Sequence, residues 1–193
     1  GENLVQVVCR AGQLGVKTVT AFLFSTENWR RERGEVMAVM TAFEGILFAY
    51  TETFKAQGVR VEAIGEIREL PECIRVALAH AAVETEEGTV SFVMAFNYGG
   101  RWDLLEALRK LLGRVAPGDL SEADVRDALA TTPYGDPDLL IRTGGERRLS
   151  NFMLWQLAYT ELYFSDLLWP DFSPAAFEEA LADYARRERR SGA

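Results

Sequence analysis

Three short polar segments of the sequence combine the residue types that bind phosphate groups in proteins. They span residues 25–31, 97–101 and 142–151. Arginine, which occurs in all three, stays charged and can donate two parallel hydrogen bonds to a phosphate. Glycine pairs in the second and third segments let a ligand approach the backbone and its N–H groups. Each segment alone is more typical of a turn or a helix cap, but together they predict a site for a phosphate or diphosphate.

Each polar segment follows a run of residues that is typical of a buried strand. These β-branched and aromatic runs cover 16–24, 89–96 and 138–142. Helical patterns lie between them, so the order of elements predicts an α/β fold with a mostly parallel central sheet and helices on both faces. Ligands of such sheets bind beyond the carboxyl ends of the strands. We therefore expect a single domain over 1–193 in which the three polar segments meet at one edge of one sheet.

Apolar spacing and capping residues predict the remaining elements. Ser121 with Asp124, and Ser173 before Pro174, are typical of helix starts. Apolar residues at helical spacing predict the bodies of the helices, and two further apolar runs predict strands. The expected helices cover 2–14, 35–57, 71–85, 101–113, 151–160 and a segment from Pro174 onward, and the further strands cover 59–64 and 161–164.

The composition excludes several classes of protein. A net charge of −8 argues against a nucleic-acid-binding protein, which would carry a basic face. The single histidine, His80, and the lack of a Gly-x-Ser-x-Gly motif argue against a serine hydrolase and a histidine-rich zinc site. We expect Cys9 and Cys73 to be buried, reduced thiols of a cytoplasmic protein. No apolar run approaches the roughly 18 residues of a membrane span, and the first residues do not resemble a signal peptide.

Five blocks of sequence resemble the signatures of the cis-prenyltransferases, the family typified by undecaprenyl diphosphate synthases. The first is Ala-Phe-Leu-Phe-Ser-Thr-Glu-Asn-Trp at 21–29, and the second is Asn-Tyr-Gly-Gly-Arg at 97–101. The others lie at 137–146, 148–164 and 168–172. They occur in the family's order and spacing, and the resemblance extends over essentially the whole chain.

The resemblance implies a parallel-sheet fold with a hydrophobic tunnel, a homodimer and a Mg²⁺ cofactor. Enzymes of this kind ionise an allylic diphosphate such as farnesyl or geranyl diphosphate. The double bond of isopentenyl diphosphate then attacks the cation, and loss of a proton leaves a cis double bond. The implied partners are these two diphosphates, with no nucleic acid, and a peripheral contact with a membrane for product release.

The resemblance also implies roles for individual residues. The residues expected to hold isopentenyl diphosphate are Arg142, Arg148, Leu149 and Ser150. The residues expected to border the substrates are Ser25, Thr26, Glu27, Trp29 and Arg31. Asn28 is expected to assist proton removal, and Glu161 to hold magnesium. The Arg190-Ser191-Gly192 tail matches an Arg-x-Gly element that reaches toward the site of a partner subunit.

The chain departs from the family pattern in two places. The family opens with a strand that ends in Met-Asp-Gly-Asn-Gly-Arg-Trp, whose aspartate binds magnesium and whose loop holds the allylic diphosphate, and no such string occurs here. We expect its absence to expose apolar sheet edges and unpaired backbone groups, and the 193-residue chain to be inactive alone. Arg147 stands where many bacterial members have histidine or glutamine, which leaves a metal contact there open.

Two other functions fit parts of this pattern. A non-catalytic partner subunit of a two-component prenyltransferase would keep the fold and the Arg-x-Gly tail, but it would not need the diphosphate-binding residues. A general phosphate-binding α/β domain would not need the five blocks.

A further hypothesis concerns product length. The helix at 35–57 and the strand with Phe92 and Met94 are expected to line the tunnel, and Leu23, where long-chain members often have alanine, would favour a shorter product.

Overall fold

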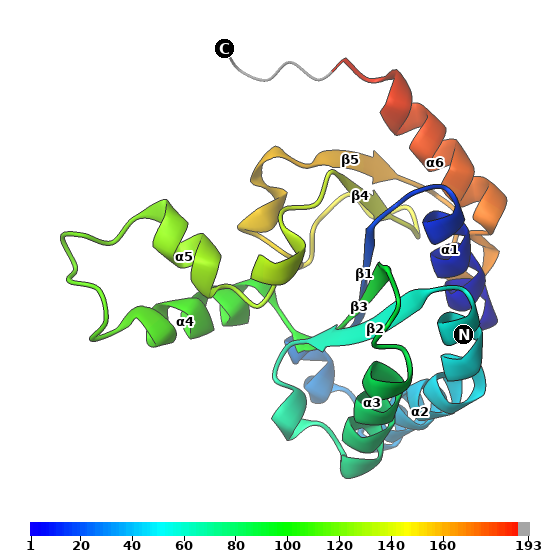
Figure 1. Ribbon diagram of the computed structural model, residues 1–193, viewed down its shortest axis with the longest axis horizontal. Helices are drawn as coiled ribbons and strands as arrows, with labels where there is room; N and C mark the ends of the chain where they lie inside the picture. Colours follow the sequence, from blue (N-terminus) through cyan, green and yellow to red (C-terminus); the bar gives the residue numbers. More distant parts are fainter. Residues whose placement is uncertain (189–193) are drawn as a thin grey trace.

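The strands form two parallel sheets in the computed structural model, which describes residues 1–188 (Figure 1). In the first sheet, β3 (Val90–Tyr98) lies between β1 (Thr18–Ser25) and β2 (Val59–Ile64). In the second, β4 (Leu139–Arg142) pairs with β5 (Glu161–Phe164). The expected α/β class with parallel strands is confirmed. The strands that we expected in one sheet are, however, divided between two.

The helices follow the sequence prediction closely, with one exception. They are α1 (Glu2–Gln13), α2 (Arg33–Ala56), α3 (Glu72–Glu84), α4 (Gly100–Leu111), α5 (Glu122–Ala128) and α6 (Pro174–Arg186). Both predicted caps are present. Ser121 N donates to Asp124 Oδ2 at 2.9 Å while Ser121 Oγ accepts from Asp124 N, and Ser173 Oγ accepts from Ala176 N at 3.3 Å.

The exception is the helix expected over 151–160, which does not form. Residues 151–155 form turns and bends, and only Gln156–Tyr159 make a short 3₁₀ helix. Asn151 and Met153 of this stretch have φ angles of 63° and 43°, and Ser150, just before it, has a φ angle of 50°. A right-handed helix cannot include residues with positive φ, and that conformation is uncommon for residues other than glycine.

One face of the first sheet packs against α1, α2 and α3. Its central strand, β3, contributes Phe92, Met94 and Phe96, which are fully buried among apolar side chains of the three helices. From Ser91 to Tyr98 every residue of β3 is buried, because the strand is covered on both faces and paired on both edges. The expected hydrophobic tunnel would lie on this face, and it stays a prediction.

The opposite face of the first sheet is covered mainly by the irregular segment 149–157 and the start of α4. Phe22 of β1 stacks on Phe152 with ring centroids 4.6 Å apart, and the Tyr98 ring lies edge-on to both. Burying such aromatic rings contributes a large part of the stability of a core. The segment that follows β4 is therefore fixed to the sheet by Phe152, although it lacks regular structure.

Helices α1 and α6 join the second half of the chain to the first. Arg10 Nε of α1 pairs with Glu178 Oε1 of α6 at 2.7 Å, and Asn3 Nδ2 donates to the carbonyl oxygens of Trp169 and Phe172. An apolar cluster between these helices includes Val19 of β1 and Ile141 of β4. The two sheets thus share a core without a hydrogen-bonded pair of strands between them.

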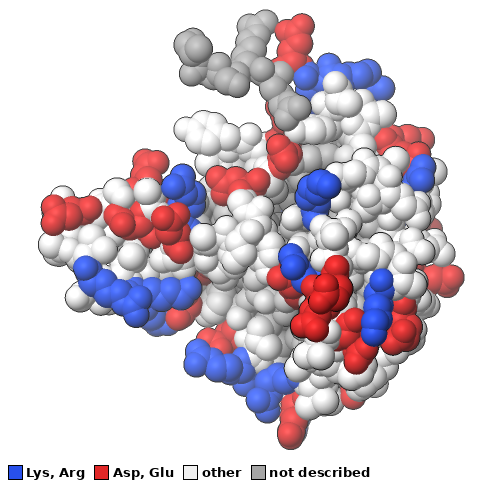
Figure 2. Space-filling view, in the orientation of Figure 1, with Lys and Arg blue, Asp and Glu red and all other residues white. Residues whose placement is uncertain are grey.

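The surface carries charges of both signs. On the face in Figure 2, basic side chains gather along α4 and acidic ones over the neighbouring α5, which together project from the body in Figure 1. His80 is exposed on α3 with its ring centroid 6.1 Å from that of Phe48, and Cys9 and Cys73 are half-buried free thiols. Within residues 1–188, no helix has both the length and the apolar character that crossing a bilayer requires.

Candidate functional site

Asn151 brings the three predicted polar segments together. Its Nδ2 donates to Glu27 Oε1 at 2.8 Å, and its Oδ1 accepts from Arg101 N at 3.0 Å. Its own carbonyl oxygen accepts from Gly100 N at 2.6 Å. One side chain thereby connects the segment after β1, the segment after β3 and the segment after β4. The expected convergence is confirmed, although the strands belong to two sheets.

Gly99 is needed for this close approach. A Cβ atom at Gly99 would lie 2.7 Å from Asn151 Nδ2 and 2.9 Å from Thr26 Oγ1, closer than real contacts of a Cβ atom. At Gly100 it would lie 2.8 Å from the backbone N of Leu154. The glycine pair therefore serves close packing of the three segments, because each position has another segment against it.

Three of the four glycine N–H groups in the two pairs are bonded within the protein, which corrects one expectation from the sequence. Gly144 N donates to Leu167 O at 2.8 Å and Gly145 N to Ser165 O at 2.9 Å, while Gly100 N donates to Asn151. These amides are already satisfied within the protein. These three N–H groups are therefore not available to a ligand.

The side chains expected to hold isopentenyl diphosphate lie at the carboxyl end of β4. Arg142 Nη1 donates to Ser150 Oγ at 3.1 Å, so the guanidinium and the hydroxyl already lie together. Arg142 Nε is buried and has no hydrogen-bond partner among the described residues. A buried donor without an acceptor is unfavourable, and a bound anion would relieve this. Arg148 forms an ion pair with Glu146 of the same loop, and Leu149 packs on the cluster around Phe152.

The segment after β1 forms a short 3₁₀ helix, Thr26–Arg30. Asn28 Oδ1 accepts a hydrogen bond from Ser25 N at 2.9 Å, so the carbonyl oxygen of this amide caps the helix. Arg31 pairs with Glu35 of α2 at 2.7 Å. The Trp29 indole donates to Asn97 Oδ1 at 2.8 Å. Hydrogen bonds and an ion pair within the protein thus already engage most of the polar groups that were expected to border the substrates.

Glu27 is the titratable group of this segment with a clear shift. Burial raises the pKa of its carboxyl, but hydrogen bonds outweigh this, chiefly from Asn151, and the pKa lies below its ordinary value. The carboxylate is therefore charged at neutral pH and accepts the bond that ties the first segment to the third.

Glu161 lies apart from the other expected residues. It begins β5 and is in register with Leu139, whereas Arg142 is in register with Phe164 at the other end of the strand pair. Three residues of strand separate these ends by about 10 Å. Glu161 Oε2 accepts from Arg187 Nη1 at 2.7 Å, and Arg187 also binds Asp183 of α6. The structure therefore does not bring Glu161 beside Arg142 and Ser150 of the same chain.

Magnesium has no cage made of protein side chains in the described part of the chain. Within residues 1–188 there is no group of three or more His, Cys, Asp or Glu side chains that could hold a metal ion. Magnesium is usually bound by one or two carboxylates, with phosphate oxygens and water as the other ligands. Glu161 fits only as a single ligand of that kind. The Arg190-Ser191-Gly192 tail lies outside the described residues.

A buried polar network behind the site was not predicted from the sequence. Asp103 of α4 is only 1% exposed, and its Oδ2 accepts from Tyr98 Oη at 2.9 Å and from Gln156 Nε2 at 3.0 Å. Its Oδ1 accepts from Ala130 N at 2.8 Å. Burial, together with the neighbouring Asp103 carboxylate, strongly raises the pKa of Tyr98. The only signal in the sequence is an acidic residue on the apolar side of a helix.

Comparisons with known proteins define the class to which this fold and site belong. The family model described as a putative undecaprenyl diphosphate synthase matches residues 1–192. An isoprenyl transferase of Geobacillus kaustophilus is 44% identical over 200 residues, which cover 100% of this chain and 77% of the relative. The (2E,6E)-farnesyl-diphosphate-specific ditrans,polycis-undecaprenyl-diphosphate synthase of Pseudomonas aeruginosa is 43% identical, with 100% of this chain and 79% of the relative covered.

A solved structure supports the same class. Lavandulyl diphosphate synthase from Lavandula x intermedia, in complex with dimethylallyl diphosphate, superposes with a TM-score of 0.95 at 38% identity. The match covers 100% of this chain and 86% of that one. The chain belongs to the undecaprenyl diphosphate synthase family of prenyltransferases, as the five sequence blocks predict.

Proposed function

We propose that this chain condenses isopentenyl diphosphate with an allylic diphosphate, such as farnesyl or geranyl diphosphate, to give a cis-polyprenyl diphosphate. The observation that carries the proposal is the convergence on Asn151. It places the loop with Arg142, Arg148 and Ser150 against the segment after β1. Two diphosphate substrates that react with each other need adjacent binding regions, and adjacency lowers the entropic cost of bringing them together.

Isopentenyl diphosphate would bind at the carboxyl end of β4. Arg142 has an unsatisfied buried Nε, and its guanidinium lies beside the Ser150 hydroxyl. Arg148 would exchange its Glu146 partner for a phosphate, and Leu149 would hold the loop to the core. Two arginines supply the charge that a diphosphate requires, and an arginine fork binds phosphate oxygens in pairs.

The allylic substrate would bind along the segment after β1, bordered by Ser25, Thr26, Glu27, Trp29 and Arg31. Its carbon–oxygen bond breaks, diphosphate leaves with the bonding electrons, and the double bond of isopentenyl diphosphate attacks the cation. A proton then leaves the new chain, and Asn28 is our candidate for assisting its removal. Apolar walls keep water from the cation, and positive groups stabilise the departing diphosphate.

We further propose that magnesium assists the reaction and that the protein is a homodimer. Magnesium, when bound, neutralises negative charge on a diphosphate, and Glu161 is the candidate protein ligand. A dimer would bring further groups to the site through the Arg-x-Gly tail. A cytoplasmic location and a peripheral membrane contact for releasing the apolar product complete the proposal.

Product length is a separate part of the proposal. Leu23 of β1 packs against the same core cluster as Phe92 and Met94. A leucine there would narrow the apolar space for a growing prenyl chain if this cluster lines the expected tunnel. We propose that the product is shorter than C55, and predominantly C55 product from radiolabelled isopentenyl diphosphate would contradict this.

The test of the function combines turnover with binding. Incubation of a longer form of the protein, extended at its amino terminus, with labelled isopentenyl diphosphate and farnesyl diphosphate should give labelled products longer than farnesyl diphosphate, whereas the 193-residue chain alone is expected to be inactive. Calorimetry should show that the chain binds isopentenyl diphosphate and that Arg142→Lys weakens this at least about tenfold. Arg126→Lys, in α5, is the matched control and should leave binding unchanged.

The alternative function is a non-catalytic partner subunit of a two-component prenyltransferase. Such a subunit would bind neither diphosphate and would instead raise the activity of another chain. Absence of binding by the unmodified protein, together with activation of a second prenyltransferase chain, would replace the proposal by this alternative.

A further inference from the structure

Asn97 has an unusual backbone conformation in a buried position. It lies in β3, is only 2% exposed, and has a φ angle of 46°. Few residues other than glycine adopt positive φ, and asparagine is among those that tolerate it best. The conformation coincides with an irregularity of the β1–β3 pairing, because Phe24 pairs with Phe96 and Ser25 with Tyr98, which leaves Asn97 without a register partner in β1. Strained residues of this kind persist where the surroundings hold them, and they often occur at functional sites.

The Asn97 side chain holds Trp29 in place. Its Oδ1 accepts the indole hydrogen bond of Trp29 at 2.8 Å. The Trp29 ring also lies edge-on to the buried Phe24 ring at a centroid distance of 5.0 Å. Trp29 nevertheless remains 38% exposed, so part of the ring is available to a ligand. One hydrogen bond and one aromatic contact thus fix the orientation of a partly exposed aromatic ring.

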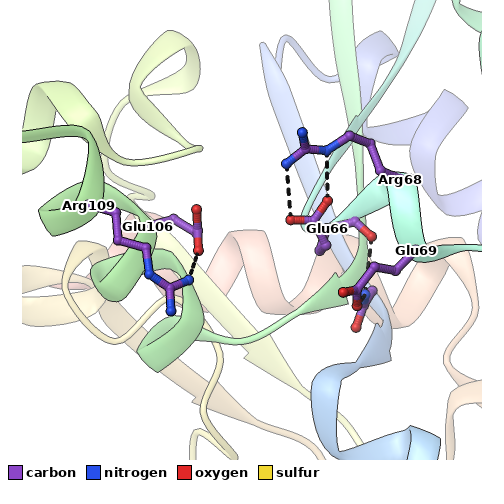
Figure 3. A network of polar contacts seen from close by, with 6 residues as sticks. Glu66, Arg68, Glu69, Glu106 and Arg109 are labelled. Carbon is purple, nitrogen blue, oxygen red and sulfur yellow. Dashed lines mark hydrogen bonds and ion pairs between the residues drawn. The ribbon is translucent and has the colours of Figure 1, made fainter.

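The other end of the Asn97 amide is attached to the loop after β2. Its Nδ2 donates to Glu66 O at 3.1 Å and to Glu69 Oε2 at 3.3 Å. The backbone carbonyl oxygen of Asn97 also accepts from Glu66 N at 3.2 Å. Figure 3 shows Glu66 and Glu69 in this loop, with Arg68 bound to Glu66. A Cβ atom at Gly65 would lie 1.8 Å from the carbonyl oxygen of Phe96, so only glycine permits this approach.

We propose that Asn97 is a positioning residue for the apolar part of the allylic substrate. It holds the Trp29 ring at the border of the segment after β1 and connects that ring to the loop 65–69. The inference rests on the proposed function, which places the allylic substrate along residues 25–31. A ring fixed before binding costs less entropy when a ligand packs against it than a ring that must first be ordered.

The first experiment tests the link between the two side chains. Protein with ¹⁵N-labelled tryptophan should give a Trp29 indole N–H signal that exchanges slowly with solvent. Asn97→Gly removes the amide but permits the positive φ, and it should make this exchange about 10-fold or more faster. Asn3→Ala is the control, because it removes an asparagine amide that bonds to the carbonyl oxygens of Trp169 and Phe172 and not to Trp29, and it should leave the Trp29 signal unchanged.

The second experiment asks whether the link matters for the allylic substrate. Trp29→Phe keeps a ring but removes the indole N–H. Asn97→Gly and Trp29→Phe should each weaken farnesyl diphosphate binding about 3- to 10-fold, the effect of one hydrogen bond. The double variant should be no weaker than the more affected single variant, because both remove the same interaction. Isopentenyl diphosphate affinity should change less than about twofold.

Asn97→Asp distinguishes the contribution of the amide oxygen, which accepts from Trp29, from that of the amide nitrogen, which donates to the loop after β2. An aspartate could still accept from the Trp29 indole, but it could not donate to Glu66 O and would be repelled by Glu69. We expect slow indole exchange to be retained and farnesyl diphosphate affinity to fall less than in Asn97→Gly.

The outcomes distinguish this inference from the function on which it rests. Unmodified protein that binds neither diphosphate would overturn the proposed function and the ligand part of the inference. Unmodified protein that binds both, together with additive effects of the two single substitutions or an equal loss for both ligands, would overturn the inference alone. Unchanged indole exchange in Asn97→Gly would overturn the positioning role whatever the ligand results.

Discussion

The Tyr98 hydroxyl donates a 2.9 Å hydrogen bond to the Asp103 carboxylate, and both residues are almost completely buried. Tyr98 ends β3, and Asp103 lies in the first turns of α4. The same carboxylate accepts from Gln156, which also donates to Thr131 Oγ1 at 2.7 Å. A single charged group therefore holds the end of the central strand, a helix and the irregular segment that covers the sheet.

Replacing Asp103 should strongly destabilise the protein. Asp103→Ala would leave the Tyr98 hydroxyl, the Gln156 amide and the Ala130 N–H without an acceptor in a buried position. We expect a loss of about 3–5 kcal/mol in the free energy of unfolding, measured by urea denaturation. Asp127→Ala on the exposed side of α5 is the control and should change it by less than about 0.5 kcal/mol. Similar small losses from both variants would contradict a structural role for the network.

Gly99→Ala should separate the polar segments of the site. The added methyl group would meet Asn151 Nδ2 and Thr26 Oγ1 at less than 3 Å, so one of them must move. We expect a destabilisation of about 1–3 kcal/mol together with weaker binding of both diphosphates. Gly45→Ala is a matched control, because Gly45 is exposed within α2 with nothing near its Cβ position. That substitution should stabilise the protein by about 0.5–1 kcal/mol.

Glu146→Gln should tighten the binding of isopentenyl diphosphate. Glu146 forms an ion pair with Arg148 in the loop after β4 and so competes with a phosphate for that guanidinium. Removing its charge should lower the dissociation constant about 2- to 5-fold at low salt, as expected for an exposed ion pair, and the gain should shrink as salt increases. Calorimetry at two salt concentrations measures this. Equal or weaker binding would mean that Glu146 supports the loop instead of competing.

The Glu27–Asn151 bond should make stability depend on pH. The folded-state pKa of Glu27 is lowered, so its contribution to stability is complete above the ordinary value of 4.5 and is lost as the pH falls through the folded pKa. Between pH 6 and about pH 3, unfolding free energy should therefore fall more in the unmodified protein than in Glu27→Gln. Parallel pH profiles for the two proteins would show that the bond adds no pH dependence.

Most helices and strands could be predicted because their apolar residues recur at a regular spacing. The segment 151–160 could not, since its apolar residues also fit a helix and only the backbone reveals the positive φ of Asn151. The convergence of the polar segments followed from the rule for parallel strands. The placement of Glu161 did not, because it depends on which residue of β4 lies opposite it. Likewise Asn97 was predicted only as part of a motif, since its hydrogen-bond partners come from the segment after β1 and from the loop after β2.

The position of β3 at the centre of its sheet also governs how the chain can reach this structure. Thr18 of β1 pairs with Ser91, so within the described residues 1–188 the partner strand of β1 is made only after about seventy further residues. At typical rates of synthesis this leaves an apolar strand unpaired for roughly 4 to 15 s on the ribosome. Pairing between residues so far apart in sequence is also slow in a free chain. Refolding yield should therefore depend on protein concentration, since unpaired β1 strands of different molecules can associate before β3 arrives.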